Sequence, residues 1–145
     1  MPRYSDTVYA DASLEKSWKT LQDAGVWGSL LGAAEIGSVR VEEGRLYGCT
    51  WTAKIGGSDL KGSMTVEKSV LHEYMDVMVR AAEWRCRIEM ELSEEPESSV
   101  RIHSRVHLTA DGFTAVLALP VVSGVIGRHF PQRMLDLAAL MANSD

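Results

Sequence analysis

Residues 84–108 contain two stretches in which apolar and polar side chains alternate without a break. Because successive side chains of a strand point to opposite faces, this period of two is typical of strands with one buried face. The polar residues 94–98 between the stretches predict a turn, so the pair predicts a β-hairpin. The predicted buried faces carry Trp84, Cys86, Ile88, Met90 and Leu92 on the first strand, and Val100, Ile102, Ser104, Val106 and Leu108 on the second.

The opposite face of the predicted hairpin carries charged side chains of both signs. Glu89 and Glu91 fall near Arg101 and Arg105, an arrangement suited to cross-strand ion pairs. The hairpin therefore predicts an antiparallel sheet with one face in water. The function of such a sheet depends on what covers its other face.

The size and composition of the chain indicate an ordinary globular protein. Its 145 residues suit a single domain, residues 1–145, with one hydrophobic core. Its hydrophobic content of 46% and charged content of 24% are typical of that class. A net charge of −5 without a basic cluster argues against a nucleic-acid partner.

Motifs for metals, cofactors and membrane spans are absent from the sequence. Cys49 and Cys86 lie far apart and in no metal-ligand spacing, so we expect two buried thiols, no metal site and no cofactor. The first residues form no apolar signal segment, which predicts a cytoplasmic protein. Residues 112–127 carry no charge but are too short to span a bilayer, which favours a buried or interfacial segment.

Further strands are predicted over residues 4–10, 35–42, 45–54, 60–69 and 73–81. Two short helices are predicted after the first of them, one starting at Leu14 behind the N-cap Ser13 and one ending at Gly32. Alternation places several apolar residues of these strands on one face: Val39 and Val41, then Tyr47, Cys49, Trp51 and Ala53, then Leu60, Met64 and Val66, and lastly Met75, Val77 and Val79.

The C-terminal region predicts a long amphipathic helix, since apolar residues recur there every three or four positions. These residues are Ile126, Phe130, Met134, Leu137 and Met141. Pro120 fits the first turn of this helix. Pro131 lacks a backbone donor, and it predicts a kink within residues 127–131 or a split into two helices.

This order of elements predicts an α+β helix-grip fold. A curved antiparallel sheet of about seven strands wraps around the long C-terminal helix, with two short helices after the first strand. The helix has no other surface on which to bury its apolar stripe. A sheet that grips one helix often leaves a cavity between the two.

The same order, with Val8, Tyr9 and Ala10 leading into residues 14–18 and 21–23, resembles the START-like superfamily (SRPBCC). That group is also called the polyketide cyclase, Bet v 1-like or helix-grip group. Within it the chain looks most similar to the carbon monoxide dehydrogenase G family. Residues 47–57 running into residues 60–66, and residues 112–128, carry this second resemblance.

The resemblance implies an apolar ligand cavity between the sheet and the helix. Members of the superfamily bind lipids, hormones or polyketides, and some cyclise or dehydrate polyketides. Members of the carbon monoxide dehydrogenase G family are associated with enzyme maturation and membrane recruitment. Residue-level roles do not follow from the resemblance, because it consists of hydrophobicity and glycine placement.

A cavity lined by aromatic and sulfur-containing side chains would suit a flat or greasy ligand, because methionine adapts to varied apolar shapes. The candidate ligand-binding residues are Trp27, Trp51, Met64, Met75, Trp84, Cys86, Met90, Phe130 and Met134. The same side chains also suit plain core packing, and large ones can fill such a cavity completely.

Candidates for catalysis are few, namely His129, Tyr47 and Ser104. A histidine at the mouth of the cavity, beside the predicted kink, would suit acid–base chemistry. Tyr47 and Ser104 are predicted to point inward, but a neutral serine without a base is a poor nucleophile. His103 and His107 fall on the charged outer face, and they are predicted to be solvated.

Three functions remain open at this point. The scarcity of inward ionisable groups favours a non-enzymatic binder of a small hydrophobic molecule, lipid-like or aromatic and polyketide-like. The alternatives are a polyketide cyclase or dehydratase, and an accessory protein with a transient membrane or enzyme partner. The third rests on residues 112–127, whose lack of charge suits an exposed apolar patch. Both a monomer and a dimer are compatible with the sequence.

Overall fold

The computed structural model describes residues 3–55 and 57–143, with the backbone alone at Ile55, at Ser58 and over residues 113–125. Its elements run β1 (Arg3–Ala10), α1 (Leu14–Leu21), α2 (Ala24–Leu31), β2 (Glu35–Glu42), β3 (Arg45–Ile55), β4 (Ser58–Val70), β5 (Tyr74–Ala81), β6 (Trp84–Glu95), a short 3₁₀ turn (Pro96–Ser98), β7 (Ser99–Ala110) and α3 (Phe113–Asn143).

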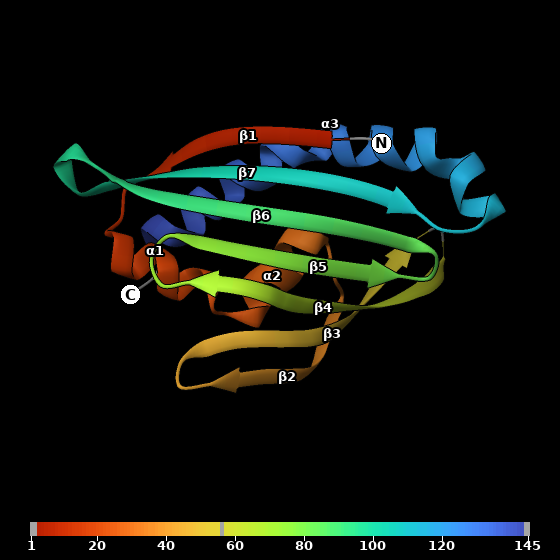
Figure 1. Cartoon of the computed structure of the whole chain (residues 1–145), viewed down its shortest axis with the longest axis horizontal. Helices are drawn as coiled ribbons and strands as arrows, with labels where there is room; N and C mark the ends of the chain where they lie inside the picture. Colours follow the sequence, from red (N-terminus) through yellow and green to blue (C-terminus); the bar gives the residue numbers. More distant parts are fainter. Residues whose placement is uncertain (1–2, 56, 144–145) are drawn as a thin grey trace.

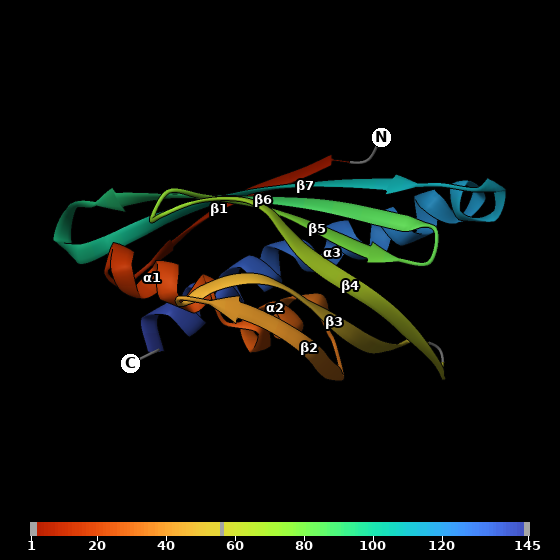
Figure 2. The same cartoon turned by 60° about the horizontal axis from the view of Figure 1, so that its bottom comes forward.

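The seven strands form one antiparallel sheet in the order β1-β7-β6-β5-β4-β3-β2. The three helices lie on the same side of this sheet, and α3 runs beneath it along β1 and β7 (Figures 1 and 2). This arrangement confirms the predicted α+β helix-grip fold. We call the side of the sheet toward the helices the inner face.

The β6–β7 hairpin follows the predicted alternation. The predicted inward residues of β7, from Val100 to Leu108, are all buried, whereas Trp84 and Cys86 of β6 are partly exposed. On the outer face Arg105 sits opposite Glu89 and forms ion pairs with Glu89 at 2.9 Å and with Glu91 at 2.7 Å. The sheet therefore has one apolar and one charged face, as the sequence predicts.

Strand β2 departs from the prediction, because Val39 and Val41 are each 48% exposed. The strand lies at the edge of the sheet, and its pairing with β3 shifts register on either side of Arg40. Ser38, with a φ of 46°, lies within this irregularity. The twist of an irregular edge strand carries these valines away from the core.

The inward prediction for Tyr47 is wrong, and a β-bulge explains the error. Arg40 pairs with Gly48 while Val41 pairs with Leu46, which leaves Tyr47 as the extra residue of β3. A bulge shifts the alternation, so Leu46 is fully buried in place of Tyr47. The Leu46 amide donates to Gln22 Oε1 at 2.9 Å, which fixes the bulge to the end of α1.

Helix α3 begins earlier than predicted. Because it starts at Phe113, Pro120 lies inside it and not in its first turn, and its backbone stays helical through Pro131 to Asn143. The predicted split into two helices is therefore wrong, and the predicted kink stays a prediction. The apolar stripe is confirmed, since Met134, Leu137 and Met141 are buried.

The two short helices begin and end on the residues that favour such positions. Ser13 caps α1 by accepting a hydrogen bond from the Lys16 amide at 3.1 Å. Asp23 caps α2 in the same way, through the Gly25 amide at 2.8 Å. Gly32 ends α2 in the left-handed conformation, with a φ of 71°, as the sequence predicts.

Candidate functional site

The inner face of the sheet divides into cross-strand rows that differ in side-chain size. One row carries Ser69, Met75, Met90 and Ser104 on β4 to β7. A second row lies three inward-facing rows further along the strands. It carries Trp51, Gly62, Ala81, Trp84 and Ala110 on β3 to β7. The two rows lie toward opposite ends of the inner face. We call the end that carries the first row the packed end, and the end that carries the second row the open end.

The packed end is closed by α1, α2 and the C-terminal half of α3. Gln22 Nε2 contacts the Met75 sulfur at 3.4 Å. The Trp27 indole N–H donates to the Leu21 carbonyl at 2.8 Å, and the residue is 0% exposed. Lys16 Nζ donates to the Ala142 carbonyl at 3.2 Å, which joins α1 to the end of α3. This end of the grip is hydrophobic core.

Most of the predicted ligand-binding residues belong to the hydrophobic core, four of them at the packed end and Met64 one row from Trp51. Those that are 0–2% exposed are Trp27, Met64, Met75, Met90 and Met134. Such exposures leave these side chains almost no contact with solvent. Phe130 is partly exposed, and its ring packs against Tyr4 with the ring centres 6.5 Å apart.

The open end has small residues where the packed end has methionines. Gly62 and Ala81 occupy the middle of the row, and Trp51 and Trp84 flank them. Gly62, Trp84 and Ala110 are partly exposed, as is Leu60 in the next row, so solvent reaches the inner face here. Figure 1 shows the α3 backbone starting at this end, directly after β7.

Trp51 reaches the inner face of this row from β3. Its indole ring lies against Gly62, where a β-carbon on the glycine would collide with ring atoms Cζ2 and Cε2. The residue is 7% exposed, and its Nε1 has no hydrogen-bond partner among the described residues. The glycine on the neighbouring strand is therefore what allows the large ring to lie flat on the sheet.

Both cysteines lie on the inner face, where burial raises the pKa of each thiol. The pKa of Cys86 rises to about 12, and that of Cys49 rises as well. A thiol with such a pKa stays protonated at neutral pH and is a weak nucleophile. Cys86 pairs with Leu108 and Val79, one row from Trp84, so it adds a neutral wall to the open end.

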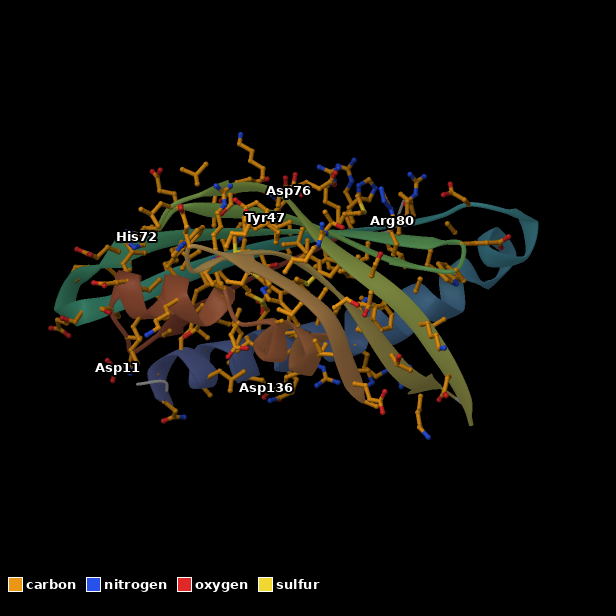
Figure 3. The ribbon with its side chains drawn as sticks, turned by 90° about the horizontal axis from the view of Figure 1, so that it is seen from below. Asp11, Tyr47, His72, Asp76, Arg80 and Asp136 are labelled. Atoms are coloured by element: carbon orange, nitrogen blue, oxygen red, sulfur yellow. The ribbon has the colours of Figure 1, made fainter. Side chains whose placement is uncertain are left out.

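The three candidate catalytic residues do not come together. His129 is exposed on α3, and Tyr47 stacks under the Arg45 guanidinium at 5.4 Å. Figure 3 shows Tyr47 on the side of the sheet that carries Asp76, away from α3. Ser104 is fully buried, and its hydroxyl has no hydrogen-bond partner among the described residues. Among the described residues, no base is therefore hydrogen-bonded to the Ser104 hydroxyl.

Sequence reasoning missed one acid on the inner face. Asp6 pairs with Ser104 across β1 and β7, and it shares its face with the buried Val8. The alternation of Tyr4, Asp6, Val8 and Ala10 in the sequence carries this signal. The side chain is partly exposed at the edge strand, so it remains accessible to water.

The outer face carries a network of charged and hydrogen-bonding side chains. Arg87 pairs with Asp76 at 2.8 Å, and the Tyr74 hydroxyl donates to Glu89 at 2.9 Å. Burial raises the pKa of Asp76 against the opposing effect of Arg87, and the hydrogen bond from Arg105 lowers the pKa of Glu89. Burial and the bond to Glu89 raise the pKa of Tyr74 to about 12.

The histidines predicted to be solvated are partly buried. His103 Nδ1 lies 2.7 Å from the Thr7 hydroxyl, and His107 Nε2 is buried on the outer face without a partner among the described residues. His72, with a φ of 64°, lies edge-on to Trp18 with the ring centres 6.2 Å apart. His103 and His107 lie on the outer face and His72 lies beside α1, so we assign the three to packing of the sheet and of α1.

Two surface hollows border the β2–β3 hairpin, and the first also reaches β4. One, of about 400 Å³, lies beside the irregular part of β2 and is lined by Ser38, Val39, Arg40, Cys49, Thr50, Ser63, Met64 and Thr65. The other, of about 590 Å³, is lined by Glu42, Glu43, Arg45 and Tyr47. In the part of the chain that the structure describes, no three potential metal-ligating side chains gather in one place.

Comparison with solved structures places this geometry in a known fold. A conserved protein from Geobacillus kaustophilus aligns with 98% of this chain and 96% of its own, at 11% identity and a TM-score of 0.75. A START superfamily protein from Mycobacterium smegmatis aligns with 93% of this chain and 92% of its own, at 14% identity and a TM-score of 0.67. The chain has the START-like helix-grip fold.

The Zhui aromatase/cyclase from Streptomyces sp. R1128 has the same fold. It aligns over 96% of this chain and 90% of its own, at 11% identity and a TM-score of 0.69. The sequence matches no family model, and no curated protein matches it significantly. Among the described residues, no helix is both long and apolar enough to cross a membrane.

Proposed function

We propose that the protein binds a small hydrophobic molecule between the sheet and α3, at the open end. One observation carries the proposal: within one apolar inner face, the side chains are fully packed at one end, whereas at the other end Gly62 and Ala81 lie between two tryptophans and Gly62 and Trp84 are partly exposed. An apolar ligand gains the most binding free energy where it moves from water onto an apolar surface that the protein does not cover itself.

The site that we propose is therefore smaller than the set of lining residues predicted from the sequence. It keeps Trp51, Trp84 and Cys86, adds Ala81 as its floor with Gly62 beneath the Trp51 ring, and leaves the packed methionines to the core. Aromatic walls over a floor of small side chains favour a flat ring system over a branched molecule, because flat faces stack on indole rings.

A polyketide cyclase or dehydratase is the runner-up, supported by the shared fold with an aromatase/cyclase. Such a reaction needs groups that move protons in contact with the ligand. Of the three candidates, His129 is exposed, Tyr47 is on the outer face, and the Ser104 hydroxyl is hydrogen-bonded to no base among the described residues. This geometry favours binding over catalysis.

The resemblance to the carbon monoxide dehydrogenase G family, with an accessory role at a membrane or on an enzyme, stays a prediction. It rests on residues 112–127, and most of these side chains lie outside those that the structure describes. Binding of the protein to vesicles of neutral and anionic phospholipid, measured by co-sedimentation, tests it directly.

Tryptophan fluorescence tests ligand binding, because two of the four tryptophans flank the proposed site. We expect saturable quenching by fluorene, 9-fluorenone or oleate at micromolar concentrations. The quenching amplitude should fall in Trp84→Phe and persist in Trp18→Phe, since Trp18 belongs to α1 at the packed end. Absence of saturable quenching by all three probes would refute the proposed function.

A further inference from the structure

We infer that the Trp51 indole N–H selects the ligand, by requiring a neutral oxygen acceptor such as a ring ketone; this inference rests on the proposed function. An indole N–H donates a hydrogen bond and cannot accept one. When such a group is buried without a partner, it loses its hydrogen bond to water and gains nothing in return.

Trp51 and Trp27 differ in the partner of their indole N–H. Both residues are at least nine-tenths buried. The Trp27 N–H donates to the Leu21 carbonyl, whereas the Trp51 N–H has no acceptor among the described residues. At the packed end a backbone carbonyl accepts the hydrogen bond of the indole. At the open end we therefore expect a ligand to supply the acceptor.

The position of the Trp51 ring directs this donor to the ligand. Ring atom Cε2, which is bonded to Nε1, lies against Gly62 on β4. The N–H edge therefore lies over β4, one strand from Ala81, and not over the far edge at β2. A flat molecule that rests on Ala81, beside the Trp51 ring, would bring its rim to this donor.

The charges around the donor exclude an anionic acceptor. The row of Trp51 contains no charged residue, and the next row, with Cys49, Met64, Val79, Cys86 and Leu108, contains none either. Burial raises the pKa of both cysteines there, so the thiols are neutral. A carboxylate placed there would lose its hydration without gaining a cation, whereas a ketone oxygen loses little.

A matched pair of probes tests this inference. Fluorene and 9-fluorenone have the same ring system, and 9-fluorenone adds one carbonyl oxygen. A hydrogen bond to a donor that is otherwise unpaired predicts that 9-fluorenone binds about tenfold more tightly than fluorene. In ¹⁵N-labelled protein, 9-fluorenone should move the Trp51 indole N–H resonance downfield, and fluorene should not. This measurement needs no variant, so it holds even where a substitution disturbs folding.

Variants then separate the hydrogen bond from ring stacking. Trp51→Phe should bring the ratio of the two affinities to about one, because phenylalanine keeps an aromatic face and removes the donor. Trp84→Phe is the matched control: it should weaken both probes and leave the ratio near ten. Oleate, with its carboxylate, should bind more weakly than 9-fluorenone.

The outcomes distinguish the inference from the proposed function. If fluorene and 9-fluorenone bind equally and the Trp51 resonance moves with neither, the inference is wrong while ligand binding stands. If oleate binds more tightly than 9-fluorenone, the neutral-acceptor requirement is wrong. If neither ring compound nor oleate binds, the proposed function is wrong and the inference with it; if oleate alone binds, only the inference is wrong.

Discussion

The two ends of the inner sheet face use the same backbone and differ in what their side chains leave uncovered. At the packed end, methionines and Trp27 meet the helices α1, α2 and α3 and are fully buried. At the open end, Gly62 and Ala81 lie between two tryptophans, and Trp84 stays partly exposed. The difference assigns the packed end to stability, and the proposed function assigns the open end to a ligand.

The largest expected effect is on stability at the packed end. Trp27→Ala removes a side chain that is 0% exposed and the hydrogen bond to the Leu21 carbonyl. It should lower the free energy of unfolding by about 3–5 kcal/mol, measured by urea denaturation. Trp84→Ala is the matched change at the open end and should cost about 1–2 kcal/mol, since part of its indole is already in water. Equal losses would remove the distinction between the two ends.

The next effect concerns Gly62, which lies beneath the Trp51 ring at the open end. Gly62→Ala places a methyl group against the Trp51 ring and the Arg80 carbonyl, so it should destabilise the protein by about 1–3 kcal/mol. It should also change the near-UV circular dichroism, because the indole must move. In the control Gly37→Ala, the nearest atom to the new methyl is Thr50 Oγ1 at 3.3 Å, and the cost should stay below about 1 kcal/mol. A neutral Gly62→Ala variant with an unchanged spectrum would contradict the placement of Trp51.

A smaller effect is expected in the chemistry of Cys86. Because burial raises its pKa to about 12, the thiol should react with a disulfide reagent at pH 8 at least about tenfold more slowly than free cysteine. Fluorene should slow the reaction further by covering the open end. Mass spectrometry of the labelled peptides, with Cys86→Ser as the control, assigns the measured rate to Cys86 or to Cys49. Rapid labelling that fluorene leaves unchanged would place Cys86 outside the site.

The smallest effect lies on the outer face and should leave the two ends unaffected. The pKa of Tyr74 is about 12 in the folded protein, above the ordinary value of 10. The stability that this group contributes is therefore present below pH 10 and is lost as the pH rises from 10 to 12. Tyr74→Phe should remove that loss of stability from the pH profile of unfolding. The same variant should lack the tyrosine absorbance change that the wild-type protein shows near pH 12. Ligand quenching should be the same in this variant, and a change in quenching would connect the two faces.

Much of the fold could be predicted from local patterns. Alternation identified the charged and apolar faces of the β6–β7 hairpin, and Ser13 and Gly32 marked helix ends, because these signals act through neighbouring residues. The errors arose where distant contacts decide. The bulge that turns Tyr47 outward depends on pairing with β2 and on Gln22, and the position of Pro120 inside α3 depends on where β7 ends.

The candidate site was predictable only in part. The sequence named Trp51, Trp84 and Cys86, and it also named five residues that the structure shows to be 0–2% exposed. Alternation shows which face a residue takes, but it contains no information on whether another element covers that face. That depends on where α1 and α2 pack, which is a property of the whole chain.

By itself, the sequence determined that this protein is an antiparallel sheet with one charged and one apolar face and a helix to cover the second. Period and composition suffice for that, because each side chain chooses between water and the core. Only the tertiary structure decided that the covering is unequal, and that Trp51 lies on Gly62 with its N–H unpaired among the described residues. Both depend on residues that are neighbours in space and not in sequence.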